Sequence, residues 1–270
     1  MDYTGSTAVV TGGGHGIGRA LAEGLAARGA RVVVGDIDKR RAAKVASRIG
    51  GIAVPCDVGD PDSIDALVGT AVRAYGPVDI AVSNAGITDQ GPDLDSTAEQ
   101  VRRIVDVNLL AHVWMAQAVL PSMLERGHGA LIQTISSAAL ITGPSGMGYT
   151  MTKHGALGFA EWVALNHARD GIRVVCLCPN AVNTGFLGRD EDREHGRSTP
   201  PDPELAAALG EVVEPEDCAT CALQALENGH FLALPHPRVG DSFARKANDY
   251  DAWLARTSER LGRMRAATGT

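Results

Sequence analysis

The sequence has no excess of basic residues. Its 25 lysines and arginines stand against 32 aspartates and glutamates, which gives a formal net charge of −7. Non-specific binding to nucleic acid or to an anionic membrane needs a basic surface, so this balance disfavours both partners. No apolar run approaches the roughly 18 residues of a membrane span, and Met1-Asp2-Tyr3 lacks the basic and apolar regions of a signal peptide. We therefore expect a cytoplasmic protein with a small-molecule partner.

A second pair of cysteines at metal-ligand spacing is also missing. The five cysteines include no second ligand pair at zinc spacing, and free cysteine packs as a small hydrophobic residue. We therefore expect buried thiols and no metal. Internal repeats and low-complexity tracts are absent too, and 270 residues of 44% apolar composition suffice for one large core. We expect a single domain over residues 1–270.

What the sequence does contain is a series of short apolar runs separated by helical patterns. The runs are mostly continuous rather than alternating, which is typical of strands in a parallel sheet covered on both faces. This alternation predicts an α/β protein, a single-domain Rossmann fold whose doubly wound, seven-stranded parallel sheet is flanked by helices. The predicted strands are Thr7–Val10, Val32–Gly35, Ile52–Pro55, Ile80–Ser83, Ala130–Ile135, Arg173–Cys178 and Phe231–Leu234.

Composition changes once along the chain, from Gly185 to Pro203, where a charged run leads into serine, threonine and proline. Because this stretch directly follows the C-terminal end of a predicted strand, we interpret residues 185–215 as a substrate lid. A solvated insertion is the alternative. The charged tail, residues 241–270, is expected to be helical and contains nothing that suggests chemistry.

Four glycines lie within TGGGHG, residues 11–16, between the first strand and the first helix. Gly12 permits a tight turn, Gly16 lets the backbone approach a pyrophosphate, and Gly18 allows close packing of the helix on the sheet. N–H groups at the helix start, at Gly16 to Gly18 and including that of Ile17, would face the anion. The pattern predicts a phosphate cradle, although a glycine-rich turn can also be only a loop.

Asp36 ends the second strand, 18 residues after Gly18. This is close to the distance at which an acidic residue meets the adenosine ribose of a dinucleotide. A carboxylate there would accept hydrogen bonds from the 2′- and 3′-hydroxyls and repel a 2′-phosphate, which favours NAD over NADP. The basic residues that follow, 39–41, could weaken this preference, but we interpret them as a solvated helix start.

Tyr149 and Lys153 lie four residues apart, so a helix would place both side chains on one face. They follow Ser136, which comes at the end of the fifth strand. Lowering the pKa of a tyrosine from about 10 to about 7 requires about 4 kcal/mol of preferential stabilisation of the phenolate. A neighbouring ammonium supplies much of this, aided by a cationic nicotinamide ring. Ser136 would then hold the substrate oxygen.

Taken together, these motifs resemble the classical short-chain dehydrogenase/reductase family. Residues 11–18 match its TGxxxGxG motif, and the similarity spans roughly Thr4 to Leu234. The further matching motifs, in the family's order and approximate spacing, are Asp57-Val58, Asn84-Ala85-Gly86, Asn108, Ser136, Tyr149 with Lys153, and Pro179 to Thr184.

The resemblance implies a role for each of these positions. Asp57 and Val58 would contact adenine, while Asn84, with Ala85 and Gly86, would help to hold the inner ribose and the central strand. Asn108, in the fourth helix, would hold a water that links Lys153 to solvent. Tyr149 and Lys153 would contact the nicotinamide ribose, and Val182 and Thr184 the carboxamide. Structural roles are the alternatives: Asn84 could cap a turn, Asn108 could satisfy helix backbone, and Thr184 could begin a helix.

Three positions depart from the family pattern. Ser136 is followed by Ser137, so either hydroxyl is a candidate, and counting from the flanking motifs selects Ser136. The usual Pro-Gly is Pro179-Asn180, where asparagine would tolerate a left-handed backbone. After the last strand, Pro-His-Pro-Arg at 235–238 replaces a glycine-rich ending.

The resulting prediction is an NAD-dependent oxidoreductase that interconverts a secondary alcohol and a ketone. The apolar segment 138–148 suits a hydrophobic substrate of steroid, terpenoid or acyl type, unless Leu140 and Ile141 only pack under the lid. The alternatives are a non-catalytic NAD(H)-sensing regulator and an epimerase or dehydratase on the same scaffold. The resemblance also implies a homo-oligomer, a tetramer or dimer, for which Trp114, Met115, Phe159 and Trp162 are candidate contacts.

Overall fold

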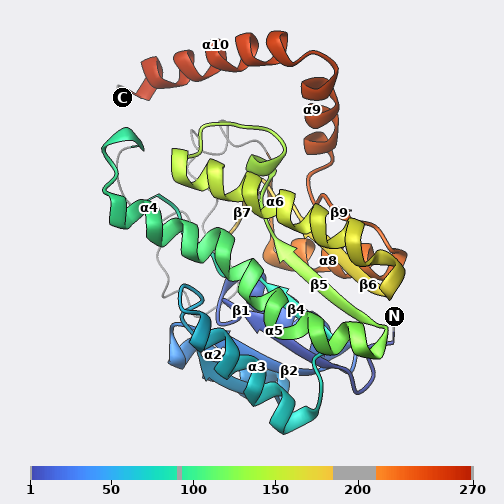
Figure 1. The fold of residues 1–270 in the computed structure, drawn as a ribbon. Coiled ribbons are helices and arrows are strands. Elements are labelled where there is room, and N and C mark those ends of the chain that lie inside the picture. Colours follow the sequence, from blue (N-terminus) through green and yellow to red (C-terminus); the bar gives the residue numbers. More distant parts are fainter. Residues whose placement is uncertain (1, 90–92, 185–210, 269–270) are drawn as a thin grey trace.

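The computed structural model of the chain describes residues 2–89, 93–184 and 211–268. Its main sheet has seven strands in the order β3-β2-β1-β4-β5-β6-β9, and every pair in it is parallel (Figure 1). The predicted α/β architecture and all seven strands are confirmed. The strands are β1 (Thr7–Thr11), β2 (Arg31–Asp36), β3 (Ile52–Pro55), β4 (Ile80–Ser83), β5 (Gly129–Thr134), β6 (Ile172–Leu177) and β9 (Leu232–Ala233).

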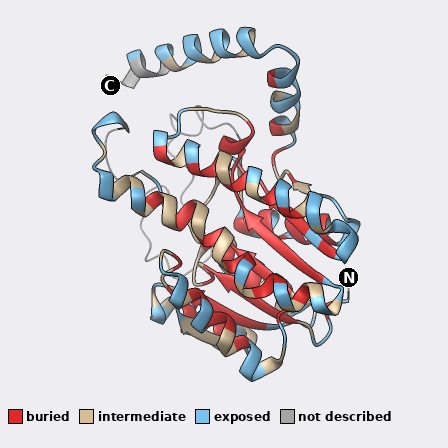
Figure 2. Cartoon of the chain, viewed as in Figure 1, coloured by how far each residue is buried: buried red, intermediate tan, exposed pale blue. Residues whose placement is uncertain are grey.

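Helices cover both faces of the sheet, because successive side chains of each strand point to opposite sides. Val9 and Val33 pack into one core and their neighbours Val10 and Val34 into the other. Figure 2 shows the strands buried between these two layers. The first layer contains α3 (Pro61–Tyr75), α5 (Ala111–Arg126) and α6 (Met147–His167), and the second contains α1 (Gly16–Ala27), α2 (Lys39–Ile49) and α8 (Pro215–Asn228).

The direction of winding reverses at β1, which pairs with β2 on one side and β4 on the other. The connections that leave these strands diverge to opposite faces, which creates a crevice at the C-terminal ends of β1 and β4. Open α/β sheets bind ligands at such a point. The glycine-rich turn follows β1, and the Asn84-Ala85-Gly86 motif follows β4, so both predicted motifs lie at this crevice.

Asn108 lies in a π-helical turn, Asp106–Leu110, that joins α4 (Ala98–Val105) to α5. Such turns occur frequently at functional sites. The continuous helical run Ala98–Arg126 is long and apolar enough to cross a membrane by length and composition alone, with a mean hydropathy of 1.3 over 18 residues. It covers the sheet with residues such as Met115 and Met123, as core helices of that composition do.

The C-terminal third adds a second, two-stranded sheet. β7 (Ala181–Val182) and β8 (Val212–Val213) pair in parallel and flank the predicted lid, of which residues 185–210 lie outside the described part of the chain. Beyond β9 the tail forms α9 (Pro237–Asn248) and α10 (Tyr250–Thr268), and α10 extends away from the sheet in Figure 1. Three short 3-10 turns complete the described elements: Asp93–Asp95, Ser137–Ala139 and Ala168–Asp170.

Candidate active site

The structure brings Ser136, Tyr149 and Lys153 together at the C-terminal end of β5. Ser136 follows β5, while Tyr149 and Lys153 lie in the first two turns of α6 and face the sheet. The side chain of Tyr149 is hydrogen-bonded to Ser136, and the Lys153 ammonium lies 5.5 Å from the centre of the tyrosine ring. This arrangement can hold a substrate oxygen between two hydroxyls.

The two adjacent serines have different partners. The Ser137 hydroxyl donates to Asn180 Oδ1 at 3.2 Å, and its N–H donates to the carbonyl of Pro179 at 2.8 Å. Ser137 is therefore hydrogen-bonded to the segment after β6, whereas Ser136 is hydrogen-bonded to Tyr149. The geometry selects the same serine as the motif spacing.

Burial disfavours the charged forms of both titratable residues. Desolvation raises the pKa of Tyr149, and the hydrogen bond from Ser136 opposes that rise. Desolvation also lowers the pKa of Lys153 to about 8, and the lysine keeps one described acceptor, the carbonyl of Thr134 at 3.1 Å. Activation of the phenol by Lys153 stays a prediction that depends on the further positive charge of a nicotinamide ring.

The side chain of Asn108 binds both backbone groups of Ile87, and its Nδ2 also donates to the hydroxyl of Thr152 at 3.5 Å. Its Oδ1 accepts from the N–H of Ile87 and its Nδ2 donates to the carbonyl of Ile87, both at 2.8 Å. A Cβ on Gly86 would lie 3.4 Å from Asn108 Oδ1 and 3.7 Å from Lys153 Nζ. Asn108 thus fixes the segment after β4 against Lys153, and the predicted water relay is not tested by the described atoms.

The glycine-rich turn folds back on its own helix. Gly12 and Gly16 have φ values of 59° and 52°, which favour glycine. A Cβ on Gly18 would collide with the carbonyl oxygen of Gly12, and a Cβ on Gly12 would lie 2.9 Å from Ala85 Cα. These glycines make room first for the backbone of the crevice itself.

The same turn also fits the predicted diphosphate. Helix α1 begins at Gly16, so the N–H groups of Ile17 and Gly18 in its first turn have no acceptor within the helix. The residue before the helix, His15, supplies no side-chain cap to them. Donors at a helix N-terminus, together with the helix dipole, suit an anion, so the residues present fit a dinucleotide phosphate.

Asn84 ties the glycine-rich turn to β4. Its Nδ2 donates to the carbonyls of Thr11 and Gly12 at 3.1 and 3.3 Å, and its N–H donates to Thr11 Oγ1 at 2.9 Å. This is the turn-holding alternative for Asn84, and it leaves the motif at the edge of the crevice. Thr11, to which the sequence analysis assigned no role, is the acceptor at its centre.

Asp36 faces the glycine-rich turn. Its Oδ2 accepts from the N–H of Gly14 at 2.9 Å and its Oδ1 from that of Asp38 at 2.9 Å. The nearby basic residues belong to the start of α2: Asp38 caps this helix through the N–H groups of Arg40 and Arg41, and these hydrogen bonds lower the pKa of Asp38. This agrees with their interpretation as a helix start.

Asp57 and Val58 follow β3. Val58 is buried, and Asp57 Oδ1 accepts from Arg103 Nη2 at 2.8 Å and from the N–H of Gly59 at 2.9 Å. Burial raises the pKa of Asp57, but these hydrogen bonds and the guanidinium charge hold it below its usual value. Arg103 therefore binds the carboxylate that was predicted to contact adenine, a contact that the motif did not reveal.

Val182 and Thr184 complete the ring of predicted cofactor residues. Val182 lies in β7, and a Cβ on Gly16 would lie 3.1 Å from Thr184 Cγ2, which places Thr184 beside the glycine-rich turn. Four predicted stretches therefore lie together at one crevice: the glycine-rich turn, Asp36, the segment 84–86 and the segment 182–184. Comparison with known proteins agrees, because the model of the short chain dehydrogenase family matches residues 6–195.

This chain belongs to the short chain dehydrogenase family. It is 34% identical over 233 residues to 2,5-dichloro-2,5-cyclohexadiene-1,4-diol dehydrogenase of Sphingobium indicum, covering 84% of this chain and 92% of the relative. It is 33% identical over 223 residues to cyclohexanol dehydrogenase of Acinetobacter sp., covering 80% and 86%. A short chain dehydrogenase/reductase of Burkholderia phymatum, solved in complex with NAD, superposes with a TM-score of 0.81 at 26% identity, covering 93% and 96%.

Asn180, a departure from the short chain dehydrogenase pattern, does not use the left-handed backbone that asparagine would tolerate. Among the described residues, only glycines have a positive φ. Asn180 instead uses its side chain, which accepts the hydroxyl of Ser137. A glycine would offer no acceptor at this position, so the asparagine changes the contacts of the turn rather than its handedness.

Asp89 is a site residue that the sequence analysis missed. Its carboxylate accepts the N–H groups of Gly148 and Tyr149 at 2.8 and 2.9 Å, and so caps α6, which otherwise has no side-chain cap at Gly146. A Cβ on Gly146 or Gly148 would run into this carboxylate. The glycines around Tyr149 were the only signal in the sequence.

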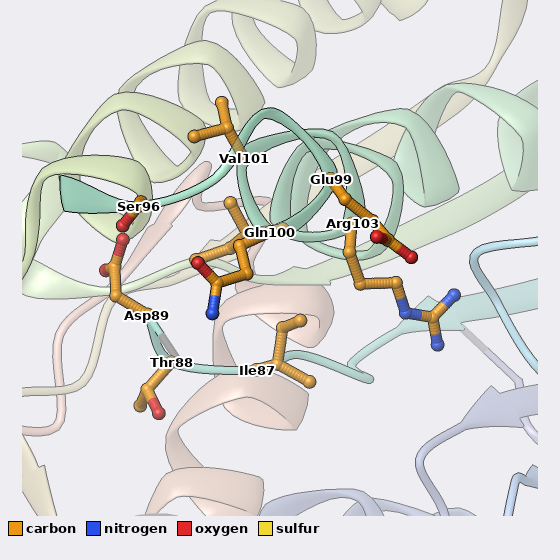
Figure 3. Close-up of a pocket in the computed structure, with 9 residues that line it drawn as sticks. Ile87, Thr88, Asp89, Ser96, Glu99, Gln100, Val101 and Arg103 are labelled. Atoms are coloured by element: carbon orange, nitrogen blue, oxygen red, sulfur yellow. The ribbon is translucent and has the colours of Figure 1, made fainter. Parts of the chain in front are cut away.

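A cavity of about 170 Å³ lies beside the site, between the segment after β4 and α4. Figure 3 shows Asp89 at one end of it and Arg103 at the other. Ser136, Tyr149 and Lys153 do not line it. The cavity adjoins the catalytic residues through Ile87 and Asp89 rather than containing them.

His112, two residues after the π-helical segment, is buried with neither ring nitrogen bonded to a described group. Burial, and then the charge of Lys153, lowers the pKa of His112 to about 3, so the imidazole is neutral.

Four of the five cysteines are buried, and Cys221 is partly exposed. Burial raises the pKa of Cys178 to about 12, and no group of three or more metal-ligating side chains occurs among the described residues.

Proposed function

We propose that this chain is an NAD-dependent dehydrogenase that interconverts a secondary alcohol and a ketone. The observation that carries the proposal is the contact of Tyr149 with Ser136 and its proximity to Lys153 at the crevice that holds the glycine-rich turn. A dinucleotide with its phosphates at the start of α1 would extend toward this group. Oxidation of a CH–OH group is the chemistry that these residues suit.

In the direction of oxidation, Tyr149 accepts the hydroxyl proton of the alcohol through its phenolate oxygen. Ser136 donates a hydrogen bond to the substrate oxygen and holds it while the carbon–hydrogen bond breaks. A bound NAD would supply the acceptor for the hydride. Lys153 stabilises the phenolate by its charge and stands next to Asn108 and Gly86, on the side where the nicotinamide ribose is expected. In the direction of reduction, Tyr149 returns the proton.

The preference for NAD over NADP is argued from Asp36. Its carboxylate faces the turn at Gly14, where a ribose 2′-phosphate would bring a second negative charge. Of the nearby cations, Arg41 lies 3.5 Å and Arg40 lies 4.0 Å from the carboxylate of Asp38, and the side chain of Arg40 is 95% exposed. The relative from Burkholderia phymatum was solved with NAD.

For the substrate, we propose a hydrophobic secondary alcohol of cyclic, steroid, terpenoid or acyl type. Two relatives are named for a cyclohexadiene diol and for cyclohexanol. Within the apolar segment 138–148, Leu140 is buried in the core, so it does not line a substrate site. Residues 141–147 are less buried and remain candidates for that wall.

A cytoplasmic homo-oligomer stays a proposal. Of the four residues predicted at its contacts, Met115 is buried in the core, Trp114 and Phe159 pack against that core, and Trp162 is 55% exposed. Trp162 is therefore the residue to mutate, and light scattering of a Trp162→Lys variant is the measurement.

The test is turnover of a panel of secondary alcohols with NAD, starting with cyclohexanol. We expect NADH formation by the wild type and a loss of at least 100-fold in Tyr149→Phe, because general acid–base catalysis contributes factors of about 10² to 10⁴. Product analysis separates this reaction from epimerisation and dehydration. Binding of NAD without turnover of any alcohol would favour the regulator.

A further inference from the structure

Two departures from the family pattern contact each other, although 56 residues separate them. The N–H of Asn180 donates to Nδ1 of His236 at 3.1 Å, and Nε2 of the same ring lies 3.1 Å from the carbonyl of Ala181. Because Nδ1 accepts, the ring proton is on Nε2, which donates to that carbonyl. His236 is only 4% exposed, so one buried, neutral imidazole binds backbone groups of two successive residues.

The loop that carries His236 is stiff. Pro235 and Pro237 flank the histidine, and a residue before proline is restricted to extended backbone. His236 has φ −111° and ψ 103°, which agrees with this restriction. It stands between β9 and α9, so its position is set both by the sheet and by the first turn of the C-terminal helix.

The peptide groups that His236 binds begin the segment that closes the crevice. At one end, Asn180 accepts the hydroxyl of Ser137, next to Ser136. At the other end, the chain runs through β7 to Thr184, which packs beside Gly16 of the glycine-rich turn. The segment 179–184 therefore connects the catalytic loop to the phosphate cradle.

We propose that His236 is a positioning residue for the nicotinamide end of the cofactor site. It fixes the peptide groups of residues 180 and 181, and through them the backbone that leads to Val182 and Thr184. This inference rests on the proposed function, because it takes the crevice to be a dinucleotide site. Without the imidazole, the part-buried N–H of Asn180 and the buried carbonyl of Ala181 lose their partners, and the segment has to move to satisfy them.

The experiment titrates NADH and ADP-ribose against the wild type, His236→Ala and His236→Asn. ADP-ribose carries the adenosine and diphosphate but no nicotinamide, so it reports the cradle alone. We expect His236→Ala to weaken NADH binding about tenfold, because the N–H of Asn180 and the carbonyl of Ala181 lose their partner, and to change ADP-ribose binding less than twofold. His236→Asn, whose amide oxygen can replace Nδ1 as acceptor, should lose less. The control is His230→Ala, because His230 is exposed.

An unchanged ratio of NADH to ADP-ribose affinity in His236→Ala would overturn the inference while leaving the proposed function intact. A parallel loss of both ligands would overturn it too, since that result indicates general destabilisation. Should His236→Ala not fold, as judged by its thermal unfolding, the comparison with His236→Asn carries the same test. Failure of the wild type to bind either ligand would contradict the proposed function first, and this inference with it.

Discussion

Asp89 caps the helix that carries Tyr149, and it does so partly through the backbone N–H of Tyr149 itself, at 2.9 Å. Asp89 belongs to the segment 84–89, which follows β4. In the same segment, the N–H of Ile87 donates to Asn108, and Asn84 donates to the carbonyl of Thr11. One stretch of six residues therefore contacts the glycine-rich turn, the π-helical turn and the catalytic helix. The placement of the phenol depends on that stretch as well as on α6.

The first prediction concerns Asp89→Asn, in which an NH₂ group replaces one of the two accepting oxygens. We expect a loss of about 1 kcal/mol in unfolding free energy, as for other helix caps. Without the second accepting oxygen, the first turn of α6 is held less firmly, and the hydrogen bond from Ser136 to Tyr149 weakens. Because that bond lowers the pKa of Tyr149, the pKa should rise further. The measurement is phenolate absorbance during a pH titration, with Tyr149→Phe subtracted. Asp95→Asn, an exposed change nearby, is the control, and an unshifted midpoint for Tyr149 would refute the role of Asp89.

The second prediction concerns the buried ammonium of Lys153. Its pKa is lowered from 10.5 to about 8 by burial, so between these values the unfolded chain binds a proton that the native protein does not. The contribution of Lys153 to the free energy of unfolding therefore rises as the pH increases from about 8 to 10.5. Relative to Lys153→Met, the wild type should gain up to about 3 kcal/mol across that window. Urea unfolding at pH 7, 9 and 10.5 measures this gain. A difference in unfolding free energy between the wild type and Lys153→Met that does not change with pH would argue against the lowered pKa of Lys153.

The third prediction concerns acid stability. Burial lowers the pKa of His112 from 6.5 to about 3, so the unfolded state takes up a proton between these values and stability falls as the pH falls through this range. His112→Leu, which removes two unpaired buried nitrogens, should unfold less readily in acid than the wild type. Thermal unfolding from pH 7 to 4 tests this, with His230→Leu as control. Equal acid sensitivity of His112→Leu and wild type would contradict the prediction.

The fourth prediction compares two glycines that occur in helices. A Cβ on Gly18 collides with the carbonyl of Gly12, whereas a Cβ on Gly158 meets nothing within 4 Å. Gly18→Ala should therefore destabilise the protein and abolish binding of NADH. Gly158→Ala, in the exposed middle of α6, should stabilise it by about 0.5 to 1 kcal/mol. Thermal unfolding and a cofactor titration of both variants check the contrast, and a stable Gly18→Ala that still binds NADH would be inconsistent with the cradle.

The fold was predictable because its signals are local. Each strand is a continuous apolar run, and the glycine-rich turn, the Ser136 region and the Tyr149–Lys153 pair can each be recognised within a few residues. The residues that hold these groups in place were not predictable in the same way. Asp89 reaches α6 across 59 and 60 residues, and His236 reaches Asn180 across 56. Contacts of this range have no periodicity in sequence.

The π-helical turn at Asn108 shows a second limit. Residues 106–110 lie inside the continuous helical run Ala98–Arg126, and no glycine or proline among them marks a change of helix type. The wider turn depends on packing against α6 and on the two hydrogen bonds to Ile87. Tertiary contacts decide such a local change of geometry.

The central claim is that the crevice at the end of β1 binds NAD. The most direct test is a fluorescence titration of the purified protein with NADH and NADPH, for the wild type and for Asp36→Ala. We predict saturable binding of NADH, weaker binding of NADPH, and loss of that discrimination in the variant. Binding of neither nucleotide by a folded wild-type protein would contradict the claim.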